Sequence, residues 1–302
     1  LRYDLLPTQE IREGLKTREP RTYGMTHWYQ LFSSRQALTL STYVTHLKNL
    51  KTEIRSALSR DRADAIITYL TLALDKCIDY NSMMSTWESD RTKVAHTFDQ
   101  HNFSFKSSHG EFDGAHQLLP WAINQVVDAY RGIVRLLPAD RFVLAMPNTL
   151  SVREESTPYP TGMSLQARTD ASERLQITLG NAADLAHLPN ESVHLVCADP
   201  PYHDNVMYGE LSDFFYVWQR LVLKDVYPDW FQEELVAKDD EAVANPARFA
   251  GTGRRSAREL AKRDYEAKMQ ACFREVFRVL HPQGVFTLMF THKSVEAWDA
   301  LA

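Results

Sequence analysis

The stretch Val193-His194-Leu195-Val196-Cys197-Ala198-Asp199-Pro200-Pro201-Tyr202 decides the fold class of this chain. Its first part follows the pattern of a strand buried in a sheet. A carboxylate, two prolines and an aromatic ring come directly after that strand. Open α/β sheets bind their ligands at the carboxyl ends of their strands. The stretch therefore predicts a strand over 193–198 and a ligand site at 199–202.

Strand and helix patterns alternate around this stretch. They predict strands at 175–179 and 285–291, helices at 211–223 and 257–280, and a loop over 225–256 with a short helix near 229–236. A short apolar segment at 141–145 and a loop over 151–170 precede them. Strands joined by helical crossovers indicate an α/β sheet.

The first half of the chain has helical periodicity instead. Apolar residues recur at helical spacing over 62–80 and 118–137, and Ser33 stands where it can cap a helix that follows it. We therefore expect three parts, namely a linker over 1–20, a mainly helical region over 21–140 and an α/β domain over 141–302.

Composition limits the class of protein. The 302 residues, of which 44% are hydrophobic, allow one large core or two ordinary ones. A net charge of −5 means that any contact with nucleic acid requires a local basic patch. Cys77, Cys197 and Cys272 form no Cys-x-x-Cys pair, so we expect free thiols, a reducing compartment and no metal site. We expect a cytoplasmic protein without a membrane span, because no run of about 18 apolar residues occurs.

Three long segments carry a family resemblance. They are Asp199-Pro-Pro-Tyr-His-Asp-Asn-Val-Met-Tyr-Gly-Glu-Leu-Ser-Asp-Phe-Phe-Tyr-Val-Trp218, Phe290-Thr-His-Lys-Ser-Val-Glu-Ala-Trp298 and Tyr23-Gly-Met-Thr-His-Trp-Tyr-Gln-Leu-Phe-Ser-Ser-Arg-Gln-Ala-Leu38. Each resembles a block of the adenine-specific DNA methylases that contain a DUF1156 domain. Arg278-Val-Leu-His-Pro-Gln-Gly284 is similar to a turn of S-adenosylmethionine-dependent amino-methyltransferases. The resemblance implies a partial Rossmann-like methyltransferase sheet over 141–302, preceded by the mainly helical N-terminal region.

This resemblance implies methyl transfer from S-adenosylmethionine to the N6 amine of adenine in DNA. Asp199 and the carbonyl of Pro200 would accept the two N–H bonds of the amine, and Pro200 and Pro201 would hold these acceptors in place. Tyr202 would stack on a base flipped out of the duplex. The N4 amine of cytosine could use the same acceptors, and a non-catalytic DNA-binding relative is the alternative from another class.

Few residues of this sequence match the part of such a site that binds the cofactor. Asn181 matches a family position that touches the cofactor, and Asp184 is a nearby alternative, although either could be a turn residue or a helix cap. The glycine-rich cofactor turn and the zinc ribbon of the family do not occur in this sequence. We therefore expect a fragment, inactive if isolated. Phe249-Ala-Gly-Thr-Gly253 resembles the missing turn, but no strand pattern precedes it, so we predict a loop there.

Further residues are candidates for contacts with the base or the DNA. Tyr208 could cover the second face of the base, as could an aromatic residue within 214–216, unless these three rings simply pack an apolar helix. Arg254 and Arg255 lie in a basic segment and could contact phosphates or face solvent.

The remaining candidates flank the predicted strand ends. They are His203, where the family usually has a second tyrosine, and Asn205, His292 and Lys293. Helix capping or support of neighbouring residues is an equal alternative for His292 and Lys293. The resemblance alone implies partner proteins of a DNA-modification or phage-defence system.

Overall fold

The computed structural model describes residues 3–136 and 179–299. The chain divides into two compact units, Leu1–Ile123 with Gly180–Ala302, and Asn124–Leu179. The predictions for 141–145, 151–170 and most of 175–179 lie outside the described residues. Every described site residue lies in the first unit.

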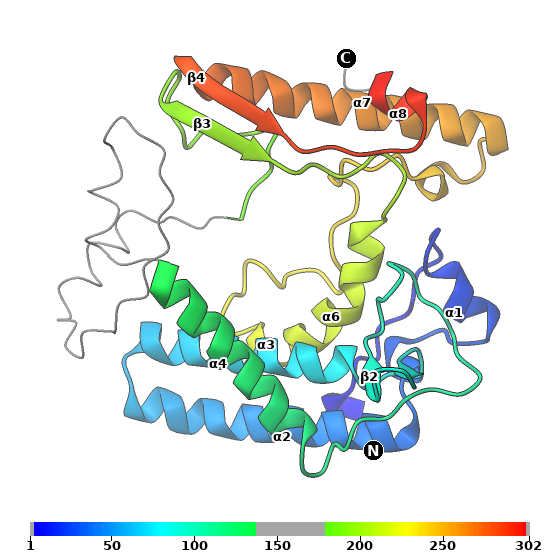
Figure 1. Cartoon of the computed structure of the whole chain (residues 1–302), viewed down its shortest axis with the longest axis vertical. Helices are drawn as coiled ribbons and strands as arrows, with labels where there is room; N and C mark the ends of the chain where they lie inside the picture. The colour runs from blue at the N-terminus through cyan, green and yellow to red at the C-terminus, as the bar shows by residue number, and fades with distance from the viewer. Residues whose placement is uncertain (1–2, 137–178, 300–302) are drawn as a thin grey trace. The chain divides into compact units, whose positions relative to one another are not determined.

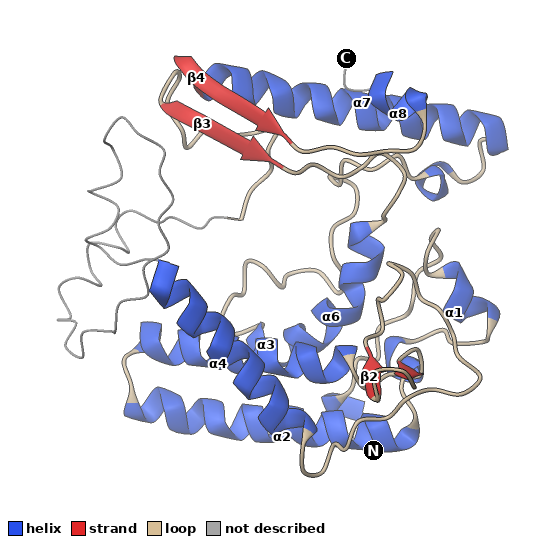
Figure 2. Ribbon diagram, viewed as in Figure 1, coloured by secondary structure: helices blue, strands red, loops and turns tan. Residues whose placement is uncertain are grey.

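The described chain is a mixed α/β protein, with helices and one short pair of strands before residue 137, and with strands β3 and β4 joined by helices after residue 192 (Figures 1 and 2). The first part contains η1 (Tyr3–Leu5), α1 (Arg18–Thr22), η2 (Trp28–Leu31), α2 (Ser34–Ala57), α3 (Arg60–Asp79), β1 (Thr86–Glu88), β2 (Lys93–Ala95) and α4 (Leu118–Leu136). The second part contains β3 (Val193–Ala198), α6 (Tyr208–Leu223), η3 (Pro246–Phe249), α7 (Arg254–Val279), β4 (Leu280–Leu288) and α8 (Val295–Asp299). Among the described helices, none is long and apolar enough to cross a membrane.

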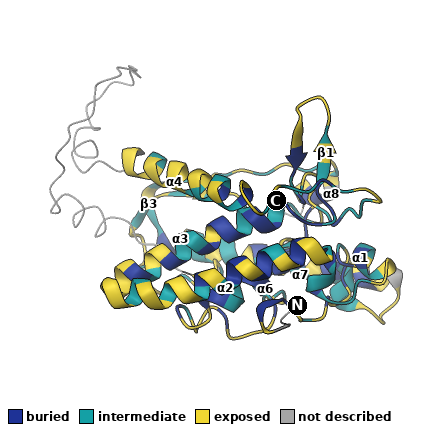
Figure 3. Ribbon diagram, turned by 90° about the horizontal axis from the view of Figure 1, so that it is seen from below, coloured by how far each residue is buried: buried dark blue, intermediate teal, exposed yellow. Residues whose placement is uncertain are grey.

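Helix α2 begins as the sequence predicts. The side chain of Ser33 accepts a hydrogen bond from the Gln36 N–H at 3.2 Å, and Gln36 Oε1 accepts one from the Ser33 N–H at 2.9 Å. This reciprocal pair satisfies two N–H groups that a helix start leaves without partners. Figure 3 shows that α2 and α3 are each buried on one side and exposed on the other.

Helix α6 packs against this helical pair through large aromatic side chains. Phe214 and Trp218 are 1% and 0% exposed. Phe32 stacks on Phe214 with ring centroids 5.5 Å apart and meets Trp218 edge-on at 5.3 Å. Core packing therefore accounts for Phe214, the alternative that the sequence offered for it.

Residues 3–20 are packed and do not form the predicted linker. Leu6 and Ile11 are buried, and the Ile11 N–H donates to the carbonyl of Thr26 at 2.8 Å. The carboxylate of Glu210, on α6, accepts hydrogen bonds from the N–H groups of Leu15 at 3.1 Å and Lys16 at 2.6 Å. An aperiodic segment can pack in this way when a side chain elsewhere satisfies its backbone.

Strands β3 and β4 pair in parallel, with α7 running beside them (Figure 1). The bounds of β3 agree with the prediction, whereas β4 begins at Leu280 and ends at Leu288, earlier than the predicted 285–291. Leu195 on β3 and Val285 on β4 are 63% and 57% exposed. The predicted burial of the 193–198 strand is therefore wrong, because its only described strand neighbour is β4 and the sheet has too few partners to bury it.

The segment between α6 and α7 has no helix at 229–236, contrary to the prediction. Side chains of α6 bind its backbone instead. Asp213 Oδ1 accepts from the Val236 N–H at 2.8 Å, and the carbonyl of Glu233 accepts from Tyr216 and Arg220 at 2.9 and 3.0 Å. These bonds replace the i to i−4 bonds that a helix would form.

The glycine-rich segment 249–253 is a turn from η3 into α7. Gly251 and Gly253 adopt positive φ angles of 94° and 85°, and Gly253 is the N-cap residue of α7. A 3-10 helix precedes the turn, so the predicted loop is confirmed and the glycines do not form a strand-to-helix cofactor turn.

Candidate active site

The residues that follow β3 line a pocket. Its volume is about 340 Å³, within the range of small-ligand sites. The lining residues are Asp199, Pro200, Pro201, Tyr202 and Tyr208. The structure thus brings together the four residues predicted to be catalytic and the tyrosine proposed for the second face of a base.

Tyr202 contacts the carboxylate of this pocket. Its hydroxyl donates to Asp199 Oδ1 at 2.6 Å, and its ring meets Phe290 edge-on with centroids 5.5 Å apart. The pKa of Tyr202 is raised, first because the hydrogen bond to Asp199 would be lost on ionisation. The phenol is therefore neutral and occupies one oxygen of the carboxylate.

A tight turn carries the chain away from the pocket. The N–H groups of His203 and Asn205 donate to the carbonyls of Pro201 and Tyr202, each at 3.0 Å, and the Tyr265 hydroxyl also donates to Pro201 at 3.1 Å. No N–H or O–H group of the described residues donates to the carbonyl of Pro200. Two acceptors on residues that line the pocket, one oxygen of Asp199 and the Pro200 carbonyl, therefore lack a donor among the described residues.

Tyr208 is the first residue of α6, and acidic side chains form hydrogen bonds around the start of this helix. Glu241 Oε1 accepts from the Gly209 N–H at 2.8 Å, and the carboxylate of Glu210 is buried among backbone N–H groups and the Asn245 amide. The pKa of Tyr208 is raised, first by partial burial and then by the negative charges of Asp199 and Glu241. Tyr208 is thus a neutral side chain on a rigid element.

A second buried acid of α6 has a charged partner. Asp213 forms a 2.7 Å ion pair with Lys238. Burial raises the pKa of Asp213, and Lys238 opposes that shift. The sequence analysis assigned no role to Glu210 or Asp213, although two acids on a strongly apolar helix were a signal for buried anchors.

The two cofactor candidates lie elsewhere. Asn181 Oδ1 accepts from the Ala183 N–H at 2.9 Å, and Asp184 Oδ1 accepts from the Ala186 N–H at 3.2 Å. Both side chains are exposed and neither lines the pocket after β3. Both act as turn residues, the alternative that the sequence left open, while Asn181 Nδ2 and Asp184 Oδ2 remain outside these bonds.

The basic segment is partly paired within the protein. Arg248 lies 3.0 Å from Asp264 and donates to backbone carbonyls, and Lys262 lies 3.6 Å from Glu266. Arg255 is exposed, and the side chain of Arg254 lies outside the described residues. Arg255 is thus one cation of this segment that still faces solvent.

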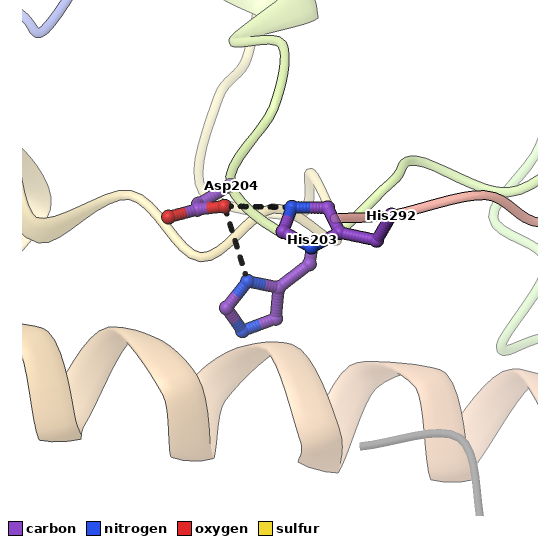
Figure 4. Close-up of side chains that lie close together, drawn as sticks. All are labelled: His203, Asp204 and His292. Carbon is purple, nitrogen blue, oxygen red and sulfur yellow. Dashed lines mark hydrogen bonds and ion pairs between the residues drawn. The ribbon is translucent and has the colours of Figure 1, made fainter. Parts of the chain in front are cut away.

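Three polar side chains converge beside the pocket (Figure 4). His203 Nδ1 and His292 Nε2 lie 3.3 and 3.1 Å from Asp204 Oδ1. Asn205 and Lys293 are exposed neighbours of this group in the sequence. Both histidines were predicted from the sequence as contacts to a base or DNA, whereas their meeting and the part played by Asp204 were not predicted.

No protein-family model, curated protein or solved structure matches this chain. The function is therefore argued from the pocket after β3 and from the chemistry of the side chains that line it.

Proposed function

We propose that this chain carries the base-accepting half of an S-adenosylmethionine-dependent DNA methyltransferase that modifies the N6 amine of adenine. The observation that carries the proposal is the pocket after the carboxyl end of β3, which is lined by an aspartate, two prolines and two tyrosines. A partial Rossmann-like sheet is the fold that we propose for β3, β4 and their helical crossover. The resemblance to DUF1156-containing methylases supports the same assignment.

The chemistry follows from the acceptors. The amine of adenine is a weak nucleophile because its lone pair is delocalised into the ring. Asp199 and the Pro200 carbonyl can each accept one N–H bond, which favours a pyramidal nitrogen with its lone pair directed away from the ring. The nitrogen would form the new N–C bond as the methyl–sulfur bond of the donor breaks and its electron pair stays on sulfur, and the surplus proton of the nitrogen would pass to Asp199 or to solvent.

Tyr202 has two positions in this scheme. In the structure its hydroxyl occupies Asp199 Oδ1, one of the two carboxylate oxygens that can accept an N–H of the amine, and in this scheme the amine takes that oxygen. Arrival of the base displaces the hydroxyl and frees the ring to stack on the base, opposite Tyr208. Stacking of a base on an aromatic side chain contributes about 1–3 kcal/mol.

The cofactor supplies the electrophilic methyl group. Asn181 and Asp184 fit a contact with its adenosine, since both are exposed and each retains a polar atom outside the turn. We assign them this role and derive no step of the reaction from it.

Methylation of DNA tests the proposal directly. The full-length protein is incubated with DNA and labelled S-adenosylmethionine, and the labelled nucleoside is identified after digestion. We expect N6-methyladenine from the wild type and none from Asp199→Ala, while Asp229→Ala, which removes an exposed carboxylate outside the pocket, keeps full activity.

Two other outcomes would change the assignment. Labelled N4-methylcytosine would make the protein a cytosine methylase, since the same acceptors serve that amine. DNA binding without a labelled nucleoside in any variant would instead support a non-catalytic DNA-binding relative.

A further inference from the structure

His203, Asp204 and His292 come from two different segments. The first two lie in the turn after the pocket quartet, and His292 lies between β4 and α8. One ligand atom from each residue falls within 4.8 Å of the other two. We propose that these three side chains bind one divalent transition-metal ion of the Zn²⁺ class.

The donor set and its spacing fit such an ion. Two imidazoles and one carboxylate with an open fourth position are a ligand set of Zn²⁺. Bonds of 2.0–2.1 Å to a tetrahedral ion place neighbouring ligand atoms about 3.3 Å apart. The measured separations from Asp204 Oδ1 are 3.3 Å to His203 Nδ1 and 3.1 Å to His292 Nε2.

His203 lacks any other partner among the described residues. Its side chain is 12% exposed, and both ring nitrogens are buried without a hydrogen bond. The nearby Tyr265 meets the His203 ring edge-on with centroids 5.1 Å apart, and its hydroxyl donates to Pro201. Buried imidazole nitrogens are rarely left without a hydrogen-bond partner, and a metal ion would satisfy one of them.

His203 is also held in an uncommon backbone conformation. Its φ angle is 51°, in the left-handed region. Its N–H donates to Pro201, and its carbonyl accepts from Ala244, each at 3.0 Å. The surrounding chain thus fixes the ring beside Asp204 at some conformational cost, as is common at functional sites.

Ser294 allows His292 to be either protonated at Nε2 or bound to metal there. The Ser294 N–H and Oγ both lie 3.1 Å from His292 Nδ1. Without an ion, Nδ1 accepts from the N–H, and Nε2–H donates to Asp204. With an ion, Nε2 coordinates it and Nδ1 must carry the proton, so the Ser294 N–H has to turn away from Nδ1 while Ser294 Oγ accepts from it.

The proposed ion would connect the segments that follow β3 and β4. His203 is adjacent to Tyr202, so the ion would restrict the movement of one wall of the pocket. This consequence rests on the proposed function, whereas metal binding itself does not. No step of methyl transfer is assigned to the ion.

Calorimetric titration of the chelator-treated protein with Zn²⁺ alone tests the proposal. We expect one equivalent to bind, and Co²⁺ in its place to produce visible absorption bands of a tetrahedral site. Loss of a ligand in His203→Asn or Asp204→Asn should weaken Zn²⁺ binding by more than about tenfold. Asparagine tolerates a positive φ angle, so His203→Asn preserves the turn.

Controls separate this site from other outcomes. His187→Asn removes an exposed imidazole and should leave Zn²⁺ affinity unchanged. Thermal unfolding without metal verifies that each variant is folded. No stoichiometric binding by the wild type, or equal affinity in the wild type and Asp204→Asn, would overturn the proposal. Neither DNA nor S-adenosylmethionine is present, so a failed methylation assay has no bearing on the result.

Discussion

The two elements that form the walls of the pocket differ in how they are supported. Tyr208 extends from α6, whose Phe214 and Trp218 are almost fully buried in an aromatic core. Asp199 and Tyr202 follow β3, where Leu195 is 63% exposed. One wall is therefore fixed by a packed helix and the other by the end of a thinly covered sheet, so the β3 wall is the one expected to move when a base enters.

Removal of a core ring should give the largest effect and would test this comparison most severely. Trp218→Ala leaves a large cavity beside Phe32 and should lower the free energy of unfolding by about 3–5 kcal/mol. The matched change on the sheet, Leu195→Ala, should lower it by no more than about 0.5 kcal/mol. Denaturant unfolding measures both, and equal losses would mean that the two walls are supported alike.

Glu210 connects α6 to the first twenty residues and should rank second. Glu210→Gln removes a buried charge that accepts from the N–H groups of Leu15, Lys16 and Thr17, so we expect a loss of about 1.5–3 kcal/mol in the free energy of unfolding. The exposed Glu234→Gln is the control and should change nothing measurable. Faster proteolysis within 1–20 in Glu210→Gln alone would show that the segment has come loose.

The helical side should also show a distinctive pH dependence. Burial raises the pKa of Asp75 from 3.8 to about 8, so between these values the folded state holds a proton that the unfolded state has lost. Stability therefore falls as pH rises through this window, by no more than about 1.4 kcal/mol per pH unit. Asp75→Asn should remove this slope, because its amide does not titrate and its oxygen can still accept from Gln219.

Urea unfolding at several pH values measures the slope. The control is Asp61→Asn, which changes an exposed acid on the same helix and should keep the wild-type slope. A wild-type slope in Asp75→Asn would assign the pH dependence to another group.

Local sequence signals predicted much of this fold. The predictions that failed concern features that depend on residues far apart in the sequence. The serine cap of α2 and the bounds of β3 could be predicted because they depend on neighbouring residues. The exposure of β3 depends on how many strands surround it, which no local pattern contains. The packing of the segment around residues 15–17 likewise depends on Glu210, almost two hundred residues further along the chain.

The same distinction applies to the site. Asp199 to Tyr202 are contiguous, so their common position after a strand followed from the sequence. His292 lies 88 residues from Asp204, and their contact requires β3 and β4 to be parallel neighbours. Both histidines were predicted at strand ends, and adjacency of those strands was the missing information.

The smallest expected effect concerns the hydroxyl of Tyr202. Tyr202→Phe removes only the hydrogen bond to Asp199 Oδ1 and keeps the ring, so no competitor has to leave when the amine binds. We expect an unchanged free energy of unfolding and a kcat/KM for methylation within about threefold of the wild type, because the bond is partly exposed and lost on binding. Tyr202→Ala, which also removes the ring, should lower kcat/KM by about tenfold or more. If Tyr202→Phe lost as much activity as Tyr202→Ala, the hydroxyl itself would be required. The hydrogen bond from Tyr202 to Asp199 would then have to persist while the base is bound, and the β3 wall would not move as proposed.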